Sequence, residues 1–458
     1  MLIHGYTGAI DIATDNVVNF LKDHVTFSQE EFPLSEKTLE MLEQRGYVTD
    51  KTAAEERQHV RRWAELFHKY NKAFSPGFMF LVSYDCNFRC PYCYEGGISG
   101  DGRHWTQQRF SKELVDKAYQ AMEQIEPRKE RQGHVITLYG GEPLMKENKE
   151  IVNYILEQGK KNGFYFNAIT NGYDLECYEE WLGPDMINFL QITLDGDQKM
   201  HDSRRFHHQT GHSFEKIYRN IKMALDKDIR VSIRFNADAN NLRYVKILEE
   251  MFRKSGYTDY KKFDFHVAML IGDENITPDG ELTGRGPSLT APNGIAYLSR
   301  KEFNKQHESL GLSSPHQDYG TFQRLYNAIS QKDKLVSFRS VFCGVQTSSY
   351  IFDPYGEIYS CWETVGVRKH VMGSYTDGLV WTEEREHWQG RNIGNTPKCS
   401  ACRYALLCGG GCMAKALRSG GDYSASYCDE YPDTFAKTAN QVYEKWLQDQ
   451  SRKTEITV

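Results

Sequence analysis

The sequence predicts an α/β fold built around a parallel sheet. Six strand-like runs alternate with amphipathic helices between residues 76 and 270, and most of these strands end in small or polar residues. Strict alternation of strands and helices produces parallel sheets with right-handed crossovers. Six units are too few for a closed eight-stranded barrel, so we expect a partial (β/α)6 barrel with its functional site at the strand carboxyl ends.

The strands of this barrel are apolar runs rich in β-branched and aromatic residues, and the helices have apolar residues at a spacing near 3.6. We predict the strands at residues 78–84, 134–140, 165–171, 189–195, 230–238 and 263–269. We predict the helices near residues 111–126, 148–162, 174–182, 214–227 and 242–255.

A small α+β unit is expected before the barrel, in residues 1–75. Residues 2–11 have the Gly turn signals of a hairpin, and short helices are expected at 16–23 and 35–45. Gly46 is a helix C-cap residue before a possible strand at 47–49, and residues 52–74 have the pattern of a linking helix. The order resembles the winged-helix units with which peptide-modifying enzymes recognise leader peptides. An N-terminal extension that packs on the main domain is the alternative.

Beyond the barrel, residues 271–340 are a bridging region and residues 341–458 a cysteine-rich domain. The bridge begins with a long loop rich in Gly, Pro, Asp and Thr, followed by helices near 299–310 and 320–332. Residues 351–359 read as a hairpin with its turn at Gly356, which would bring Cys361 back towards Cys343. A closing helix is expected at residues 430–449.

Composition excludes several classes of function. The chain has 458 residues, 40% of them hydrophobic and 13% aromatic, which is enough for about three domains with large cores. A net charge of −6 gives no reason to expect a nucleic-acid partner. The sequence has no apolar run of about 18 residues and no signal-peptide pattern, so we expect no membrane partner and a cytoplasmic location.

The eleven cysteines indicate metal binding. Cytosolic thiols are kept reduced, so disulfides are not expected. Three cysteines lie between residues 86 and 93, seven lie between 343 and 428, and Cys177 stands alone in a helical segment as a packed thiol. Such grouping is typical of metal ligands rather than of scattered core residues.

The first group, Cys86, Cys90 and Cys93, has the spacing CxxxCxxC directly after the first strand. Iron–sulfur clusters are held mainly by thiolates, and three of them are one short of closing a four-iron cluster. One iron would then bind a ligand that is not protein. A zinc site or unrelated thiols are the alternatives.

Polar and small residues at four further strand ends share a rim with this loop. Strand two ends in Gly140-Gly141-Glu142-Pro143, and strand three in Thr170-Asn171-Gly172. Strand four ends in TLDG from Thr193, followed by His201, Asp202, Arg204 and Arg205, and strand five carries Arg234 and Asn236. So many on one rim are hard to explain as turns alone.

Taken together, the CxxxCxxC loop, the GGEP motif and the TLDG motif followed by HDxxR resemble the radical S-adenosylmethionine (radical SAM) enzymes, which have a partial TIM-like barrel. The seven later cysteines resemble the SPASM extension, which carries auxiliary iron–sulfur clusters. The resemblance covers residues 76–430. It extends to the members that mature ribosomally made peptides, including those that form thioethers or cyclophanes.

In that family, S-adenosylmethionine binds the open iron and is cleaved to a 5′-deoxyadenosyl radical, which abstracts a substrate hydrogen. The resemblance implies that Gly140, Gly141 and Glu142 face the methionine amine. Thr193 and Arg205 match positions that meet the carboxylate or ribose, although the neighbouring Arg204 stays open as an alternative. Asn171 either reaches the ribose or adenine or is only a turn residue.

The resemblance also implies three 4Fe–4S clusters, one in the barrel and two auxiliary. The first auxiliary cluster is matched by Cys343, Cys361 and Cys412. The second is matched by Cys399, Cys402, Cys408 and Cys428. With three cysteines, the first either takes a non-cysteine ligand or keeps an open iron for a substrate thiolate.

We therefore expect an oxidoreductase that cross-links a precursor peptide with a leader, by a thioether from a Cys sulfur to a carbon. A flavodoxin- or ferredoxin-type donor would supply electrons. A carbon–carbon or carbon–oxygen link is the alternative. Sulfatase maturation is disfavoured because Trp362 stands where those relatives have an Asp that acts as the base. A non-catalytic, zinc-stapled peptide-binding protein is a further alternative, and the sequence indicates no catalytic base.

Overall fold

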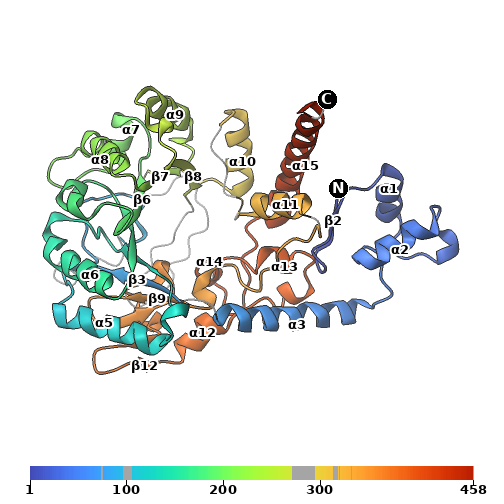
Figure 1. The fold of residues 1–458 in the computed structure, drawn as a ribbon, viewed down its shortest axis with the longest axis horizontal. Coiled ribbons are helices and arrows are strands. Elements are labelled where there is room, and N and C mark those ends of the chain that lie inside the picture. Colours follow the sequence, from blue (N-terminus) through green and yellow to red (C-terminus); the bar gives the residue numbers. More distant parts are fainter. Residues whose placement is uncertain are drawn as a thin grey trace.

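The computed structural model describes residues 1–73, 76–95, 106–270, 294–312, 318, 320–331 and 333–456, with side chains up to residue 452. Its centre is one ten-stranded sheet in the order β12-β11-β10-β9-β3-β4-β5-β6-β7-β8. Helices of the barrel cover the outer side of this sheet, and the C-terminal and N-terminal elements extend away from it (Figure 1). The molecule is thus an α/β protein with a large, mostly parallel sheet.

Six parallel strands confirm the predicted barrel strands. They are β3 (Gly77–Leu81), β4 (Val135–Tyr139), β5 (Tyr165–Thr170), β6 (Ile187–Thr193), β7 (Arg230–Ala237) and β8 (Phe263–Met269). The first strand is shorter than predicted, because the chain turns into the cysteine loop directly after Val82. Val82 N makes the last hydrogen bond to β4, to the Tyr139 carbonyl. Large aromatic side chains such as Phe80, Phe166 and Phe235 are fully buried between sheet and helices.

The barrel helices are α5 (Lys112–Ile125), α6 (Lys149–Lys161), α8 (Phe214–Asp226) and α9 (Val245–Lys254), as predicted. The helix predicted at 174–182 is instead a 3-10 stretch over Leu175–Trp181. The sequence did not predict α7 (Gln198–Arg204), which begins where the Asp197 side chain accepts a hydrogen bond from Met200 N at 2.9 Å. This short helix sets the positions of the two arginines that follow strand β6.

The predicted C-terminal hairpin is confirmed, and the structure adds where it lies. Strands β9 (Ser349–Phe352) and β10 (Glu357–Tyr359) pair antiparallel, with Ile358 opposite Phe352. β9 also lies parallel to β3, so that the hairpin extends the barrel sheet, and β11 (Gly373–Ser374) and β12 (Val380–Trp381) continue it. The cysteine-rich region is therefore joined to the barrel by backbone hydrogen bonds.

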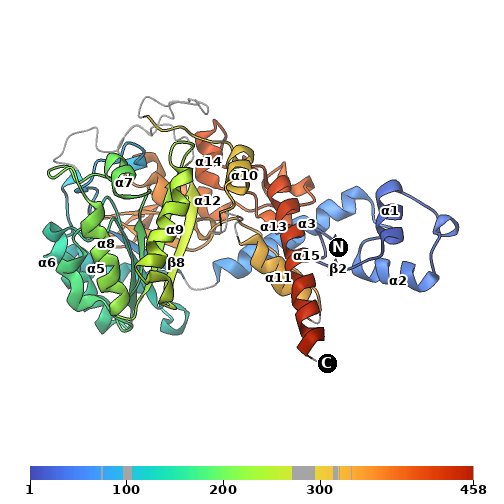
Figure 2. The same ribbon diagram turned by 90° about the horizontal axis from the view of Figure 1, so that it is seen from above.

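The N-terminal unit has the predicted hairpin, β1 (Leu2–Ile3) with β2 (Ile10–Asp11), and the predicted helices α1 (Asp15–Asp23), α2 (Glu36–Arg45) and α3 (Ala53–Lys72). The strand expected at 47–49 is wrong. There the Tyr47 hydroxyl donates to the Leu2 carbonyl and to Asp11, so this segment is fastened by a side chain instead of by strand pairing. α1 and α2 lie at the far end of the molecule from the barrel, beyond α3 (Figures 1 and 2).

Of the remaining helices, three were predicted in position and differ in length. α10 (Arg300–Ser309) and α11 (Thr321–Ser330) match the predictions, and α15 (Tyr431–Ile456) continues past the predicted end at residue 449. The long loop expected at 271–293 lies outside the described residues. Three short helices, α12 (Glu384–Gly390), α13 (Ala405–Cys408) and α14 (Met413–Arg418), connect the cysteines of the C-terminal region. Within the described part of the chain, none of the helices combines the length and apolarity of a membrane span.

Candidate functional site

The cysteine loop after β3 gathers three thiols. Cys86 and Cys90 are half-buried and Cys93 is exposed, and none forms a disulfide. The loop turns tightly, since Phe88 N donates to Cys86 Sγ at 3.3 Å and Cys93 N donates to the Cys90 carbonyl at 3.1 Å. Burial raises the pKa of the Cys86 thiol, and the neighbouring Glu142 and Cys90 add to this effect. Such thiols ionise when a cation compensates the charge, as a bound metal does.

The two glycines of the GGEP motif let the end of β4 approach this loop. A Cβ on Gly140 would lie 2.4 Å from the Ser83 carbonyl oxygen, and one on Gly141 would lie 2.3 Å from that of Asp85. Gly141 N donates to the Ser83 carbonyl and Glu142 N to the Asp85 carbonyl, both at 2.9 Å. The backbones of the two loops are therefore in direct contact, which no larger residue would permit.

Glu142 joins the ends of two strands. Its side chain is 2% exposed and accepts hydrogen bonds from Leu144 N at 2.9 Å and from Thr170 Oγ1 and Asn171 N at 2.5 Å. Burial raises the pKa of this carboxyl to about 7 despite the three donors. In this structure the carboxylate organises the rim on which an ammonium group was expected.

Asn171 holds the cysteine loop. Its Nδ2 donates to Asn87 Oδ1 at 2.7 Å, and its Oδ1 accepts from Tyr173 N at 2.9 Å. Asn87 in turn donates to Asp174 at 3.1 Å. Both polar ends of the Asn171 side chain thus have protein partners, so the structure places it as a turn residue that also braces the loop.

The two adjacent arginines after β6 have different environments. Arg204 is buried and forms ion pairs with Asp195 at 3.5 Å and Asp238 at 3.1 Å. Arg205 faces the cysteine loop, where its Nη1 donates to the Tyr92 hydroxyl at 2.8 Å, and its buried Nε has no partner among the described residues. Thr193 is buried at the end of β6, opposite Arg234 of β7. Of the two adjacent arginines, Arg205 is the one with a buried donor that has no partner among the described residues.

Tyr92, between the second and third cysteines, was missed as a site residue. Its hydroxyl donates to Asp195 at 2.5 Å and accepts from Arg205 at 2.8 Å and from Asn236 Nδ2 at 3.4 Å. This single side chain fastens the cysteine loop to the ends of β6 and β7. The signal was an aromatic residue within the CxxC spacing, which the sequence alone does not distinguish from a core aromatic.

A second polar group leads from this loop towards the C-terminal cysteines. The Tyr94 hydroxyl donates to Glu95 at 3.1 Å and is hydrogen-bonded to the Tyr139 hydroxyl. Burial raises the pKa of Glu95 to about 8. Burial also raises the pKa of Tyr139, and Cys93, Glu363 and Cys361 contribute. Tyr139 is therefore close to a cysteine of the first group and to a cysteine of the second.

The seven C-terminal cysteines fall into two groups. Burial and the proximity of Glu363, Cys412 and Cys343 raise the pKa of the Cys361 thiol. Burial raises the pKa of Cys408 to about 11, and Cys428 and Cys402 contribute. Cys408, Cys428 and Cys402 in turn contribute to the raised pKa of the Cys399 thiol. The sets of three and four are those that the resemblance implied, and their role as ligands stays a prediction.

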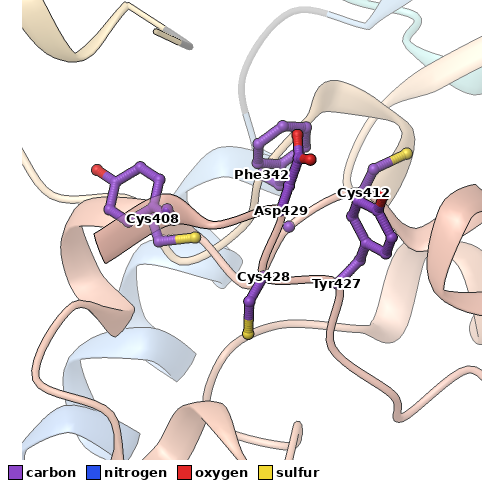
Figure 3. A pocket seen from close by; sticks show the side chains of 8 residues that line it. Phe342, Cys408, Cys412, Tyr427, Cys428 and Asp429 are labelled. Carbon is purple, nitrogen blue, oxygen red and sulfur yellow. The ribbon is translucent and has the colours of Figure 1, made fainter. Parts of the chain in front are cut away.

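Figure 3 shows where the two groups meet, in a small pocket lined by Cys408, Cys412 and Cys428. The Cys412 side chain points away from those of Cys408 and Cys428. In the described part of the chain, no three or more Cys, His, Asp or Glu side chains close around a point for a single ion. The ten thiols in three groups are nevertheless the donor set that iron–sulfur clusters take. Cys177 instead packs against the barrel core.

Glu363 is the carboxylate next to the three-cysteine group. It contributes to the raised pKa of Cys343, Cys361 and Cys412. Its carboxylate pairs with Arg418 at 2.9 Å, and Trp362 beside it is 37% exposed. It is thus a non-cysteine group close to all three thiols, but it already has a cationic partner.

Comparison with known proteins agrees with this geometry. Residues 80–237 match the family model of the Radical SAM superfamily. A cysteine-type anaerobic sulfatase-maturating enzyme of Clostridium novyi is 21% identical over 384 residues, which are 79% of this chain and 94% of that protein. A putative glycyl-radical enzyme activating enzyme of Methanocaldococcus jannaschii is 27% identical over 138 residues, 30% of this chain and 45% of that protein.

Solved structures share the fold over most of the chain. Native anSMEcpe with bound AdoMet has a TM-score of 0.58 at 17% identity, covering 81% of this chain and 98% of that one. The SuiB enzyme of Streptococcus suis bound to S-adenosylmethionine has a TM-score of 0.50 at 14% identity, covering 86% and 87%. Residues 80–237 are therefore a Radical SAM domain, and the chain shares its fold with the anSMEcpe and SuiB enzymes.

Proposed function

We propose that this protein is an oxidoreductase that uses S-adenosylmethionine and three 4Fe–4S clusters to cross-link a ribosomally made precursor peptide, through a thioether from a Cys sulfur to a carbon. The observation that carries the proposal is the group Cys343, Cys361 and Cys412, which has three thiols and lies near Tyr139, a residue that is also close to Cys93 of the barrel site. The bound cofactors would supply the one-electron chemistry that removes a hydrogen atom from the substrate.

In this proposal the barrel residues hold the cofactors. Cys86, Cys90 and Cys93 bind the first cluster. The unpartnered Nε of Arg205, together with Thr193, receives the carboxylate or ribose of S-adenosylmethionine. The backbone of Gly140 and Gly141 and the carboxylate of Glu142 meet the methionine amine, because this turn lies directly against the cysteine loop. Asn171 acts mainly by bracing that loop, and ribose or adenine contact is its secondary role.

The C-terminal groups hold the auxiliary clusters. Cys399, Cys402, Cys408 and Cys428 complete the second one. In the first, Glu363 stays paired with Arg418, which leaves one iron for a substrate thiolate. Such a thiolate would be held beside Tyr139, close to where a carbon-centred radical forms.

The parts of the chain divide the remaining work. Residues 76–270 are the radical SAM barrel, 271–340 a bridge and 341–458 the SPASM domain. Residues 1–75 recognise the peptide leader, since α1 and α2 carry a small core of their own around Phe20 and Leu39. A flavodoxin- or ferredoxin-type donor in the cytoplasm reduces the clusters.

Two other functions compete with this one. The Clostridium novyi relative favours sulfatase maturation, but that reaction lacks its base here, because Trp362 cannot accept a proton and Glu363 is ion-paired. A carbon–carbon or carbon–oxygen link would need the auxiliary clusters only for electron transfer. The thioether proposal differs from both in consuming one peptide thiol per link.

The test uses anaerobically reconstituted enzyme, dithionite, S-adenosylmethionine and the small peptide encoded beside the gene. The expected product is about two mass units lighter per link and takes up one iodoacetamide fewer per link than the substrate. A lighter product with all its thiols still alkylated would indicate the carbon–carbon or carbon–oxygen reaction. Cys86→Ala should form no product, whereas Cys177→Ala, which removes the cysteine outside the three groups, should react normally.

A further inference from the structure

A buried arginine lies where the two auxiliary cysteine groups meet. Arg391 follows α12 directly, and its side chain is 4% exposed. Its guanidinium donates to three backbone carbonyls, those of Ala425 at 2.6 Å, Gly410 at 3.2 Å and Gly411 at 3.4 Å. These contacts fix its position from two different loops.

No carboxylate of the described residues balances the charge of this arginine. The groups near the guanidinium that can become negatively charged are instead the thiols of Cys399, Cys412 and Cys408. Its Nε is also buried without a partner among the described residues. Burying an unpaired cation is costly, so buried charges in proteins are normally paired or bound to a charged ligand. Neutral carbonyls satisfy its hydrogen bonds but do not supply the missing negative charge.

The location of Arg391 indicates that the cysteine groups supply the balancing negative charge. Gly410 and Gly411 belong to the turn between Cys408, of the four-cysteine group, and Cys412, of the three-cysteine group. A Cβ placed on Gly410 would lie 3.6 Å from Cys399 Sγ and 3.8 Å from Arg391 Nη1. The guanidinium is therefore close to the four-cysteine group. The sulfur-bearing side chains of Cys408 and Cys412 leave this turn in different directions (Figure 3).

We infer that Arg391 is the shared counterion of the two auxiliary iron–sulfur clusters, and that its fixed positive charge raises their reduction potentials. This inference rests on the auxiliary clusters of the proposed function. A cluster held by thiolates is anionic, and reduction adds a further negative charge. A buried cation beside it therefore stabilises the reduced form more than the oxidised form. Arg391 acts as a positioning and tuning residue and touches no substrate.

The test compares three variants of the full-length, anaerobically reconstituted enzyme. Arg391→Met removes charge and hydrogen bonds, Arg391→Gln removes the charge but keeps an N–H donor, and Arg391→Lys keeps the charge but loses the planar fork. All are made in a background with Cys86, Cys90 and Cys93 replaced by Ala, so that only auxiliary clusters contribute. The readouts are bound iron and the midpoint potentials from EPR-monitored redox titration.

We expect Arg391→Met and Arg391→Gln to shift both midpoints to lower values. At a fixed solution potential their ratio of reduced to oxidised cluster should fall about tenfold, which corresponds to about 59 mV for one electron. Arg391→Lys should shift less than half as far. If the neutral variants lose auxiliary iron while Arg391→Lys retains it, the counterion role is also supported.

Two results would overturn the inference. Unchanged midpoint potentials in Arg391→Met at full iron content would mean that the arginine charge does not affect the reduction of the clusters. An equal shift or equal iron loss in all three variants would mean that the fork serves only to join the loops. The proposed function predicts on the order of twelve irons per chain in the unmodified protein. Iron analysis of that protein therefore separates these results from failure of the proposed function.

Discussion

The barrel rim and the cysteine-rich C-terminal region are held together in opposite ways. On the rim, side chains from different strands bind one another: Glu142 links β4 to β5, and Asn171 braces the cysteine loop through Asn87. In the C-terminal region, the cysteines are carried by loops and short helices. There the turn at residues 409–411 has three glycines with φ of 82°, 90° and 74°, and Arg391 donates to backbone carbonyls.

From this difference we expect that the first site is formed by the protein before any cofactor binds, whereas the proposed auxiliary site depends on its clusters. Where a metal site is not held by the fold alone, the free energy of metal binding becomes folding free energy. The four predictions below test this contrast, starting with the largest effect and ending with the smallest.

The largest effect should follow removal of the clusters. With anaerobic chelation we expect amide-exchange protection of residues 399–428 to fall by at least tenfold, while the strands β3–β8 keep theirs. Metal binding contributes on the order of 10 kcal/mol in sites of this kind, which exceeds what the glycine-rich turn supplies. Hydrogen-exchange mass spectrometry compares the loaded and chelated protein. Equal loss of protection in both regions would contradict the contrast.

On the barrel rim, Gly141→Ala should disrupt the contact between the two loops. The new Cβ would lie 2.3 Å from the Asp85 carbonyl oxygen, so the turn must move away from the cysteines. We expect a loss of about 1–3 kcal/mol in stability and at least a tenfold slower S-adenosylmethionine cleavage. Urea unfolding and the yield of 5′-deoxyadenosine measure the two effects.

Gly183→Ala is the matched control for that variant, since nothing lies within 4 Å of its Cβ position and it precedes β6 outside the rim. Its stability and cleavage rate should match those of the unmodified protein. A similar defect in both variants would show that the close approach at Gly141 is not the cause.

The adjacent arginines should separate stability from cofactor binding. Arg204→Gln leaves Asp195 and Asp238 buried without their cation and should lower stability by about 3–5 kcal/mol. Arg205→Gln should leave the melting temperature nearly unchanged and weaken S-adenosylmethionine binding about ten- to a hundredfold. Calorimetry of unfolding and of binding tests both, and reversed effects would exchange the two roles.

The smallest effect concerns the junction between the two regions. Asp353 is fully buried, accepts a hydrogen bond from Tyr84 at 2.9 Å, and has its pKa raised from 3.8 to about 7, chiefly by burial. The folded state therefore binds a proton that the unfolded state releases between about pH 4 and pH 7. Stability should fall by on the order of 1–3 kcal/mol as the pH rises through this window, and stay level above it.

Asp353→Asn removes the titrating group and should flatten that part of the pH profile. Urea unfolding of both proteins at intervals between pH 5 and pH 8 provides the measurement. If the two proteins show parallel profiles, the pH dependence arises elsewhere in the molecule.

The sequence by itself determined the local elements and the chemistry of the ligands. The six barrel strands follow from runs of apolar residues with turn signals between them, because strand and helix formation depends on residues that are neighbours in the chain. The resemblance to the radical SAM family also came from local patterns. These are the spacing around Cys86, the GGEP turn and the spacing of the seven later cysteines, which can all be seen in the sequence without knowing the fold.

Only the tertiary structure decided which distant residues meet. It placed β9 beside β3, gave Arg204 two buried carboxylates while Arg205 faces the cysteine loop, and put Tyr92 at the junction of three elements. It also showed that Arg391 donates to the turn between Cys408 and Cys412. These contacts join residues far apart in the chain, and their energies come from burial and charge in a place that no local pattern encodes.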